Sequence, residues 1–183
     1  MFTPRIEHRA KQRYVAIRER APREALADVI PRLLSDVYRR LEALAITAAG
    51  GPLVRYRVVD YGRNTVEIDV GVPVVASTAL DHGRVRSGVI PGGTFATVIH
   101  RGSYTRLAET TAKLLAWGKH KRLRWQVRAG SGVTSWRGRV EHYLTGPPSE
   151  SKPRHWKTEI AILLAQPRGL AVKRYHTTSS KGS

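Results

Sequence analysis

The sequence predicts an α+β fold in which two duplicated β-α-β-β units form one antiparallel sheet with two main helices, pseudo-two-fold symmetry and a central groove. Three observations lead to this fold class. Residues 65–74 alternate apolar and polar side chains, the pattern of a half-buried strand. Apolar side chains recur every three or four residues over 26–44 and again over 107–115, as on one helix face. A shift of 81 positions aligns the first helical pattern with the second without a gap.

The internal repeat can be followed at single positions. After the shift, Leu26 coincides with Leu107 and Leu33 with Leu114. One β-α-β-β unit alone would leave its apolar face uncovered, so the two copies are expected to pack about an approximate two-fold axis. A cleft is expected at their junction, and clefts of this kind are where small molecules bind.

The length of the chain favours one domain, which we place at residues 1–168. Repeat one is expected at about 4–80 and repeat two at about 84–165. The tail, 169–183, ends in HTTSSKGS and has no periodicity, so it is expected to be disordered or of artificial origin.

The first unit opens with a predicted strand at 13–18, followed by the first helical pattern. Pro31 lies within that pattern and removes one backbone donor. We therefore expect the regular helix to begin near Pro31 and residues 23–30 to form a looser turn. The sequence Gly-Gly-Pro at 50–52 ends the element.

Two extended runs complete the first unit, at 54–59 and 65–74, separated by a turn at 60–64. In the second run one face is expected to be buried and the other exposed, the exposed face carrying Glu67, Asp69, Gly71 and Pro73. The second unit repeats the order, with a strand at 94–100, a helix from about 104 to 121, and strands at 136–144 and 157–164.

The net charge of +18 is concentrated in the second half of the chain. Residues 1–81 carry 13 basic and 10 acidic side chains, whereas residues 82–183 carry 19 and 4. Such a surface attracts polyanions. The simplest interpretation is a set of solvated side chains with only non-specific nucleic-acid contact. A dedicated nucleic-acid site and an engineered charge are the alternatives.

No cysteine is present, which excludes disulfides and thiolate metal sites. Arg5, Glu7, His8, Arg9 and Lys11 interrupt the N-terminal segment, where a signal peptide would need an unbroken apolar run. No later window approaches 18 apolar residues. We therefore expect a cytoplasmic protein without membrane contact. No phosphate-binding loop and no metal-ligand spacing is found, so neither a cofactor nor a metal is expected.

Five segments, taken in order and spacing, resemble the GyrI-like family of gyrase-inhibitor-like and AraC-type effector-binding domains. They are VEIDVGVPV (66–74), IPGGTFATVIHRGSYTRL (90–107), LLAWG (114–118), RVEHYL (139–144) and WKTEIAILL (156–164). The resemblance covers roughly residues 4–165 and implies two helices laid on an antiparallel sheet.

The resemblance also implies a range of functions. The fold occurs in effector domains of bacterial multidrug regulators, in free-standing gyrase-inhibitor-like proteins, and in hydrolases that open the cyclopropane of DNA-alkylating antibiotics. Residues 1–13 are too few for a helix-turn-helix, so we expect a stand-alone member, as a monomer or weak homodimer. The leading hypothesis is a domain that binds drug-like, planar aromatic molecules and sequesters or detoxifies them. The alternatives are such a hydrolase, or a basic-surface protein that contacts nucleic acid or gyrase.

Members of the family that bind drugs often take organic cations, but the charge of this chain does not favour such ligands. A molecule of charge +18 repels cations over a Debye length of about 8–10 Å at ordinary salt. Cationic ligands are therefore less favoured in this chain.

Glu141 and Tyr143 are the candidate catalytic residues. They are two positions apart in a predicted strand, so both project from the same face. A carboxylate walled by aromatic rings loses solvation, so the pKa of Glu141 should rise and fit it for general-base work or ligand binding. The resemblance implies that this glutamate lies at the floor of the groove, with Tyr143 steadying developing charge. The alternative is a surface ion pair between Glu141 and Arg137 or Arg139.

Aromatic side chains supply most of the area of an apolar pocket. Tyr104 and Trp136, at the ends of predicted elements, are the preferred wall residues. Trp117 on the helix could equally be core, and His100 could be a structural histidine. Glu159 could bind ligand or pair structurally with Glu67 of the first repeat. The full set of candidate ligand-binding residues is Tyr56, Phe95, His100, Tyr104, Trp117, Trp136, Trp156 and Glu159.

Overall fold

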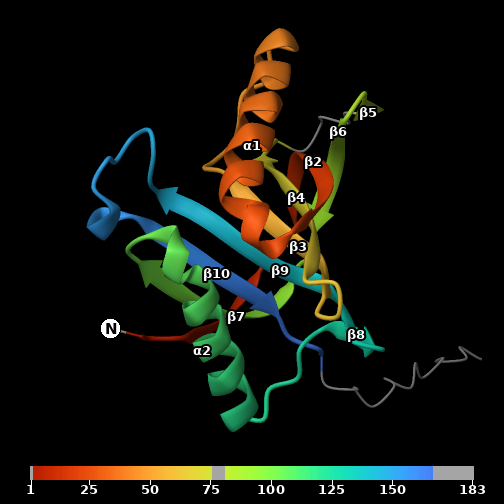
Figure 1. Cartoon of the computed structure of the whole chain (residues 1–183), viewed down its shortest axis with the longest axis vertical. Helices are drawn as coiled ribbons and strands as arrows, with labels where there is room; N and C mark the ends of the chain where they lie inside the picture. Colours follow the sequence, from red (N-terminus) through yellow and green to blue (C-terminus); the bar gives the residue numbers. More distant parts are fainter. Residues whose placement is uncertain (1, 76–80, 167–183) are drawn as a thin grey trace, which may run out of the picture.

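The computed structural model describes residues 2–75 and 81–166 (Figure 1). In this part of the chain two main helices pack on a curled antiparallel sheet, which confirms the α+β class. The expectation of a disordered or artificial tail at 169–183 falls outside the described residues.

The elements follow the predicted order, with additional strands. The first half contains β1 (Arg5–Arg9), β2 (Gln12–Pro22), a 3-10 turn (Arg23–Ala25), α1 (Leu26–Ala43), β3 (Leu53–Asp60) and β4 (Thr65–Pro73). The second half contains β5 (Asp81–His82), β6 (Val85–Ile90), β7 (Gly93–Arg101), a 3-10 turn (Tyr104–Arg106), α2 (Leu107–His120), β8 (Val127–Gly130), β9 (Val133–Thr145), a 3-10 turn (Pro153–His155) and β10 (Lys157–Leu163). The two β-α-β-β units are therefore β2-α1-β3-β4 and β7-α2-β9-β10.

The order of strands in the sheet displays the two-fold relation between the units. It runs β1-β7-β10-β9-β3-β4-β2-β6-β5, with β8 paired to β9, and the neighbours are antiparallel. From the central β9–β3 pair outward, one side reads β9, β10, β7 and the other reads β3, β4, β2. The pseudo-two-fold axis therefore passes between β3 and β9.

The outer strands are exchanged between the units. Strand β1 precedes β2 in the chain but pairs with β7, and β6 precedes β7 but pairs with β2. The registers match under the 81-residue shift, since Arg5 lies opposite Thr97 and Arg86 lies opposite Ala16. Each β-α-β-β unit is thus preceded by a strand that pairs with the other unit.

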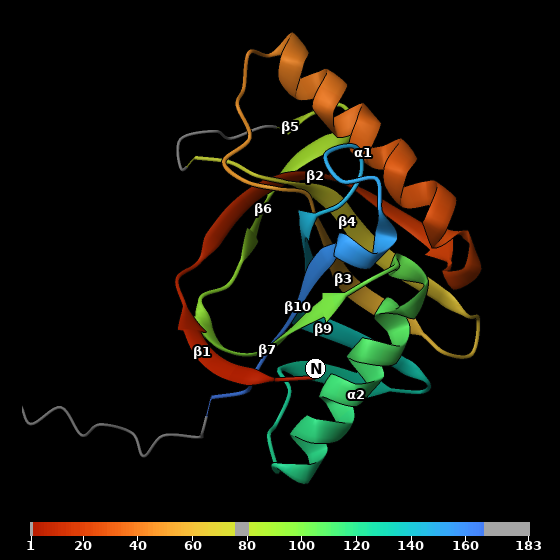
Figure 2. The same cartoon turned by 90° about the vertical axis from the view of Figure 1, so that its left-hand side faces the viewer.

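Both faces of the curled sheet carry apolar cores. Figure 2 shows α1 and α2 on the same side of the sheet. On that side Leu33 and Val37 of α1 and Leu114 of α2 are fully buried in the larger core. The opposite, concave side holds a smaller core that includes Tyr14 and Phe95. Each side of the sheet therefore has its own buried apolar cluster.

The prediction that β4 is buried on one face only was wrong. The valines and Ile68 face the helices as expected, but Asp69 is 3% exposed, and Gly71 and Pro73 are also buried. Asp69 lies within the concave core, where the Tyr14 hydroxyl donates to it at 2.6 Å and Arg18 Nε donates at 2.7 Å. A buried carboxylate with such partners looks the same in sequence as an exposed one.

The prediction that the first helix begins near Pro31 was also wrong, because α1 starts at Leu26 and continues through the proline. The proline removes one N–H, whose ordinary acceptor would be the carbonyl of Ala27, one turn earlier. The buried stripe of Leu33, Val37 and Leu41 holds the helix on the sheet, so one missing bond near its first turns does not end it.

We predict that Gly71→Ala destabilises the protein by about 1–3 kcal/mol, the usual cost of overpacking a core. A Cβ at position 71 would lie 1.9 Å from the backbone oxygen of Val15 on the neighbouring strand. Urea unfolding measures the change. Gly130→Ala in β8 is the matched control, because its Cβ would meet no atom within 4 Å. Equal stability of the two variants would contradict the tight approach of β2 and β4.

Candidate functional site

A cavity of about 640 Å³ opens over the β3–β9 junction, between the N-terminal ends of α1 and α2. Its rim is built from the same four positions in each unit. In the first unit these are Arg23, Glu24, Leu26 and Ala27, and 81 residues later they are Tyr104, Thr105, Leu107 and Ala108. The predicted cleft between the repeats is therefore present and lies on the pseudo-two-fold axis.

The floor of the cavity contains a carboxylate bound by two tyrosines. Glu141 of β9 is 4% exposed. Its Oε2 accepts hydrogen bonds from the Tyr56 hydroxyl at 3.3 Å and from the Tyr143 hydroxyl at 3.2 Å. The register of β3 and β9 brings these side chains together, because Val54 lies opposite Glu141 and Tyr56 opposite Arg139. The exposed ion pair with Arg137 or Arg139 considered from sequence does not form among the described residues.

Burial sets the protonation of this group. Desolvation raises the pKa of Glu141, while Arg139 and the two tyrosine hydrogen bonds act in the opposite direction. Burial, together with the nearby Glu141 carboxylate, also raises the pKa of Tyr56 and Tyr143. The tyrosines therefore remain neutral donors, and Glu141 retains its proton to a higher pH than an exposed glutamate.

An aromatic wall flanks the carboxylate on the α2 side. The rings of Tyr104 and Trp156 lie 4.4 Å apart between centroids at 34°, and Tyr104 meets Tyr143 edge-on at 5.1 Å and 90°. The Trp156 indole Nε1 donates to the carbonyl of Glu150 at 2.7 Å, which fixes its orientation. Three rings thus present a rigid apolar surface to the cavity.

Charged side chains of the first unit and of β9 complete the lining. The Arg139 guanidinium lies over the ring of Tyr56, 4.5 Å from its centroid, and 5.4 Å from that of Trp136. At the rim, Arg23 approaches the ring of Tyr61 at 6.0 Å, and Glu24 accepts a hydrogen bond from Asn64 at 2.9 Å.

Of the ten candidates from the sequence, five line this cavity: Glu141, Tyr143, Tyr56, Tyr104 and Trp156. Trp136 lies one layer deeper, 8% exposed and beneath Arg139. Its indole Nε1 has no hydrogen-bond partner among the described residues.

The other four candidates lie elsewhere. His100 is buried and bonds Thr110 at 2.8 Å and the Ser103 carbonyl at 3.0 Å, which holds the turn between β7 and α2. Trp117 packs partly buried against the helix-side core. Phe95 belongs to the concave core, because alternate residues of β7 face opposite sides of the sheet.

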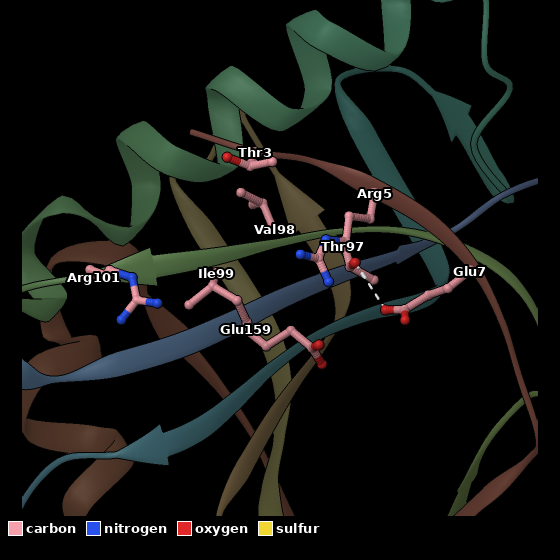
Figure 3. Close-up of a pocket in the computed structure, with 8 residues that line it drawn as sticks. All are labelled: Thr3, Arg5, Glu7, Thr97, Val98, Ile99, Arg101 and Glu159. Carbon is pink, nitrogen blue, oxygen red and sulfur yellow. Dashed lines mark hydrogen bonds between the residues drawn. The ribbon is translucent and has the colours of Figure 1, made fainter. Parts of the chain in front are cut away.

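Glu159 also faces the concave side, where two Arg9 nitrogens donate to it at 2.7 Å each. It borders a second cavity, of about 390 Å³, over β1, β7 and β10 (Figure 3). The other carboxylate there, Glu7, accepts from Thr97 at 3.0 Å and also contacts Arg9. Both carboxylates of this cavity have protein partners, and none of the described aromatic side chains lines it, so the first cavity is the better ligand site.

The cavity also contains four residues that were not predicted from the sequence: Arg23, Leu26, Ala27 and Arg139. The first three could have been found, since the 81-residue shift superimposes them on Tyr104, itself a candidate, and on its near neighbours Leu107 and Ala108. Arg139 could have been found from its spacing of two from Glu141, which places both on one strand face.

Neither a metal site nor a membrane-spanning helix is found among the described residues. No group of three or more histidines, aspartates or glutamates there is placed to hold a metal ion. No helix in this part of the chain is long and apolar enough to span a bilayer.

Comparison with protein families matches residues 2–165 to a family described as GyrI-like small molecule binding domain. Comparison with curated proteins gives no match.

Several solved structures share the fold. The C-terminal domain of EcmrR superimposes with a TM-score of 0.69 at 18% identity, covering 91% of this chain and 99% of that domain. EcmrR in its DNA complex gives 0.71 at 16% identity, and there the match spans 91% of this chain but 58% of EcmrR. A hydrolase from Listeria innocua gives 0.56 at 13%, covering 88% and 91%. SAV2435 bound to tetraphenylphosphonium gives 0.59 at 11%, covering 89% and 94%.

We predict that Glu141→Gln stabilises the protein at pH 8 and much less at pH 4. The folded state holds the proton of Glu141 more tightly than the unfolded state, because the pKa is raised. The free energy of unfolding of the parent protein therefore falls as the pH rises from the ordinary carboxyl pKa through the pKa of Glu141 in the folded protein. Each tenfold difference in proton affinity between the two states corresponds to a loss of about 1.4 kcal/mol. Glutamine keeps an acceptor for both tyrosines without that cost.

Thermal unfolding of both proteins across pH 4–8 measures the difference. Glu42→Gln, at an exposed position of α1, is the control for loss of one negative charge. If Glu141→Gln raises the stability by the same amount at every pH, burial of this carboxylate does not govern its protonation.

Proposed function

The chain belongs to the GyrI-like family of small-molecule binding domains, and we propose that it binds a planar, aromatic, drug-like molecule between α1 and α2 and thereby sequesters it. The observation that carries this proposal is the wall of Tyr104, Trp156 and Tyr143 beside a buried carboxylate. Flat rings already held by protein contacts can stack on a ligand at little entropic cost.

The size and chemistry of the cavity support a ligand of drug size. Its volume of about 640 Å³ lies within the roughly 300–1,000 Å³ typical of small-molecule sites. Leu26 and Leu107 supply apolar contacts from the two helices. Glu141 supplies one polar contact that can orient the ligand, because its Oε1 has no hydrogen-bond partner among the described residues.

The structural relatives are compatible with this proposal. SAV2435 has the same fold and was solved with tetraphenylphosphonium, a molecule that carries aromatic rings. The chain spans 58% of EcmrR in its DNA complex. A stand-alone role in the cytoplasm, as expected from the sequence, remains part of the proposal.

A second candidate function is hydrolysis in the same cavity. The observation that favours it is Glu141, a carboxyl group of raised pKa beside the Tyr143 hydroxyl. In its ionised form Glu141 would take a proton from water while the water oxygen attacks a strained cyclopropane carbon. The ring C–C bond would break, its electron pair passing into the conjugated system of the substrate, with Tyr143 steadying the charge.

The basic second half supports a separate, non-specific contact with polyanions. Exposed basic side chains that form no ion pair among the described residues gather from the C-terminal end of α2 to the start of β8: Lys119, Lys121, Arg122, Arg124 and Arg128. The cavity lies at the opposite, N-terminal end of α2. Polyanion contact and ligand binding would therefore use different surfaces.

We predict that Ala27→Trp and Ala108→Trp each weaken ligand binding at least about tenfold, a loss of roughly 1.4 kcal/mol. Both alanines are exposed at equivalent positions of the rim, so an indole at either would enter the cavity without disturbing the core. Calorimetric titration with anthracene-9-carboxamide, a planar neutral probe, measures the affinity.

Ala43→Trp is the matched control, since Ala43 is exposed at the far end of α1. If all three variants bind the probe as tightly as the parent protein, the ligand does not occupy this cavity.

For the hydrolase candidate, we predict that the parent protein converts a cyclopropane-bearing alkylator into a product heavier by one water. Glu141→Gln should abolish turnover while retaining binding, because glutamine cannot accept the proton. Mass spectrometry follows the product, with Glu42→Gln as control. Binding of the compound without product in the parent protein would exclude the hydrolase and leave sequestration.

A further inference from the structure

The cavity contains a guanidinium whose only charged neighbour of note is Glu141, two residues along the same strand, with which it interacts electrostatically without a hydrogen bond or ion pair among the described residues. Among the described residues, the Arg139 side chain makes neither a hydrogen bond nor an ion pair, although it is only partly exposed. Its contacts are the faces of Tyr56 and Trp136. A guanidinium carries five N–H donors. No Arg139 nitrogen is among the buried atoms that lack a partner in the described part of the chain, so its donors remain accessible to a ligand.

Arg139 occupies the place that a cationic ligand would use. A cation binds best over the face of an aromatic ring, and the ring of Tyr56, beside Glu141, is covered by Arg139 at 4.5 Å. An organic cation entering here would have to displace Arg139 or lie next to its charge. This arrangement is unfavourable for a ligand such as the tetraphenylphosphonium bound by SAV2435.

The remaining charges around the cavity are unevenly partnered. Glu141 is held by two tyrosine hydroxyls and Glu24 by Asn64. Arg23, like Arg139, has no side-chain hydrogen bond or ion pair among the described residues. The N-terminal ends of α1 and α2 both border the cavity and add partial positive charge. The polar groups of the site that lack a hydrogen-bond partner among the described residues are therefore mainly the N–H donors of its two arginines.

We infer that the ligand of this cavity is an aromatic anion, with a carboxylate or sulfonate bound by Arg139 and rings stacked on the wall of Tyr104 and Trp156. The inference rests on the proposed function and narrows its ligand class. A guanidinium presents two parallel N–H groups that match two oxyanion oxygens, which a lysine cannot do. The free Oε1 of Glu141 would then meet a hydrogen-bond donor at the other end of the ligand.

Three probes with one skeleton test this inference: anthracene-9-carboxylate, anthracene-9-carboxamide and 9-(aminomethyl)anthracene, titrated calorimetrically at about 0.15 M salt. The carboxylate should bind about 10–100-fold more tightly than the amide, as expected for charge-assisted hydrogen bonds of about 1.5–3 kcal/mol. The ammonium should bind most weakly.

Variants then assign the effect to one side chain. Arg139→Gln should reduce the affinity for the carboxylate to that for the amide, while the affinity for the amide changes less than about threefold. Arg139→Lys should restore only part of the preference. Arg137→Gln is the matched control, because Arg137 is an exposed residue of the same strand outside the cavity, and its loss removes the same charge.

The outcomes separate the two proposals. Equal affinity of the parent protein for carboxylate and amide, tightest binding of the ammonium, or equal effects of Arg137→Gln and Arg139→Gln would overturn the inference and leave the proposed function intact. A uniform loss of affinity for all three probes in Arg139→Gln would assign Arg139 a structural role and overturn it as well. If the parent protein binds none of the probes, the proposed function fails and the inference fails with it.

Discussion

Strands β3 and β9 hydrogen-bond to each other across the middle of the sheet, and both the symmetry and the site depend on this ladder. It joins the two units, so the helices begin on either side of one junction. Its register places Tyr56 opposite Arg139 and directs Glu141 toward the helices. A slip of one residue would turn these side chains to the concave face, because successive residues of a strand face opposite sides. The pairing of β3 with β9 therefore determines which side chains face the site.

The two units supply the same backbone positions but different chemistry. At the rim, Arg23 and Glu24 of the first unit occupy the places of Tyr104 and Thr105 in the second. A dimer of identical units would have to present each residue twice. Because both units belong to one chain, one side of the cavity has become charged and the other aromatic. A ligand that enters therefore meets a defined polar end and a defined stacking surface.

Elements marked by a local periodicity could be predicted from the sequence, whereas features determined by contacts between distant residues could not. The helices and the strands of the two units followed from patterns of apolar residues. Strand β1, with the sequence RIEHR, has no such pattern and is extended because β7 offers it hydrogen bonds. The pair Glu141 and Tyr143 could be placed on one face from spacing alone. Phe95 and Glu159 could not be assigned to the correct face, since both faces of this sheet are apolar.

The exchange of β1 and β6 has a consequence for how the chain is made. Arg5 cannot meet its partner until Thr97 has left the ribosome, and β2 likewise waits for β6 before its outer edge is covered. Until more than half of the protein has been synthesised, the first unit exists with an open strand edge, a state that invites pairing with other chains. Translation speed and chaperone access during that interval would then govern the yield of native protein, independently of its final stability.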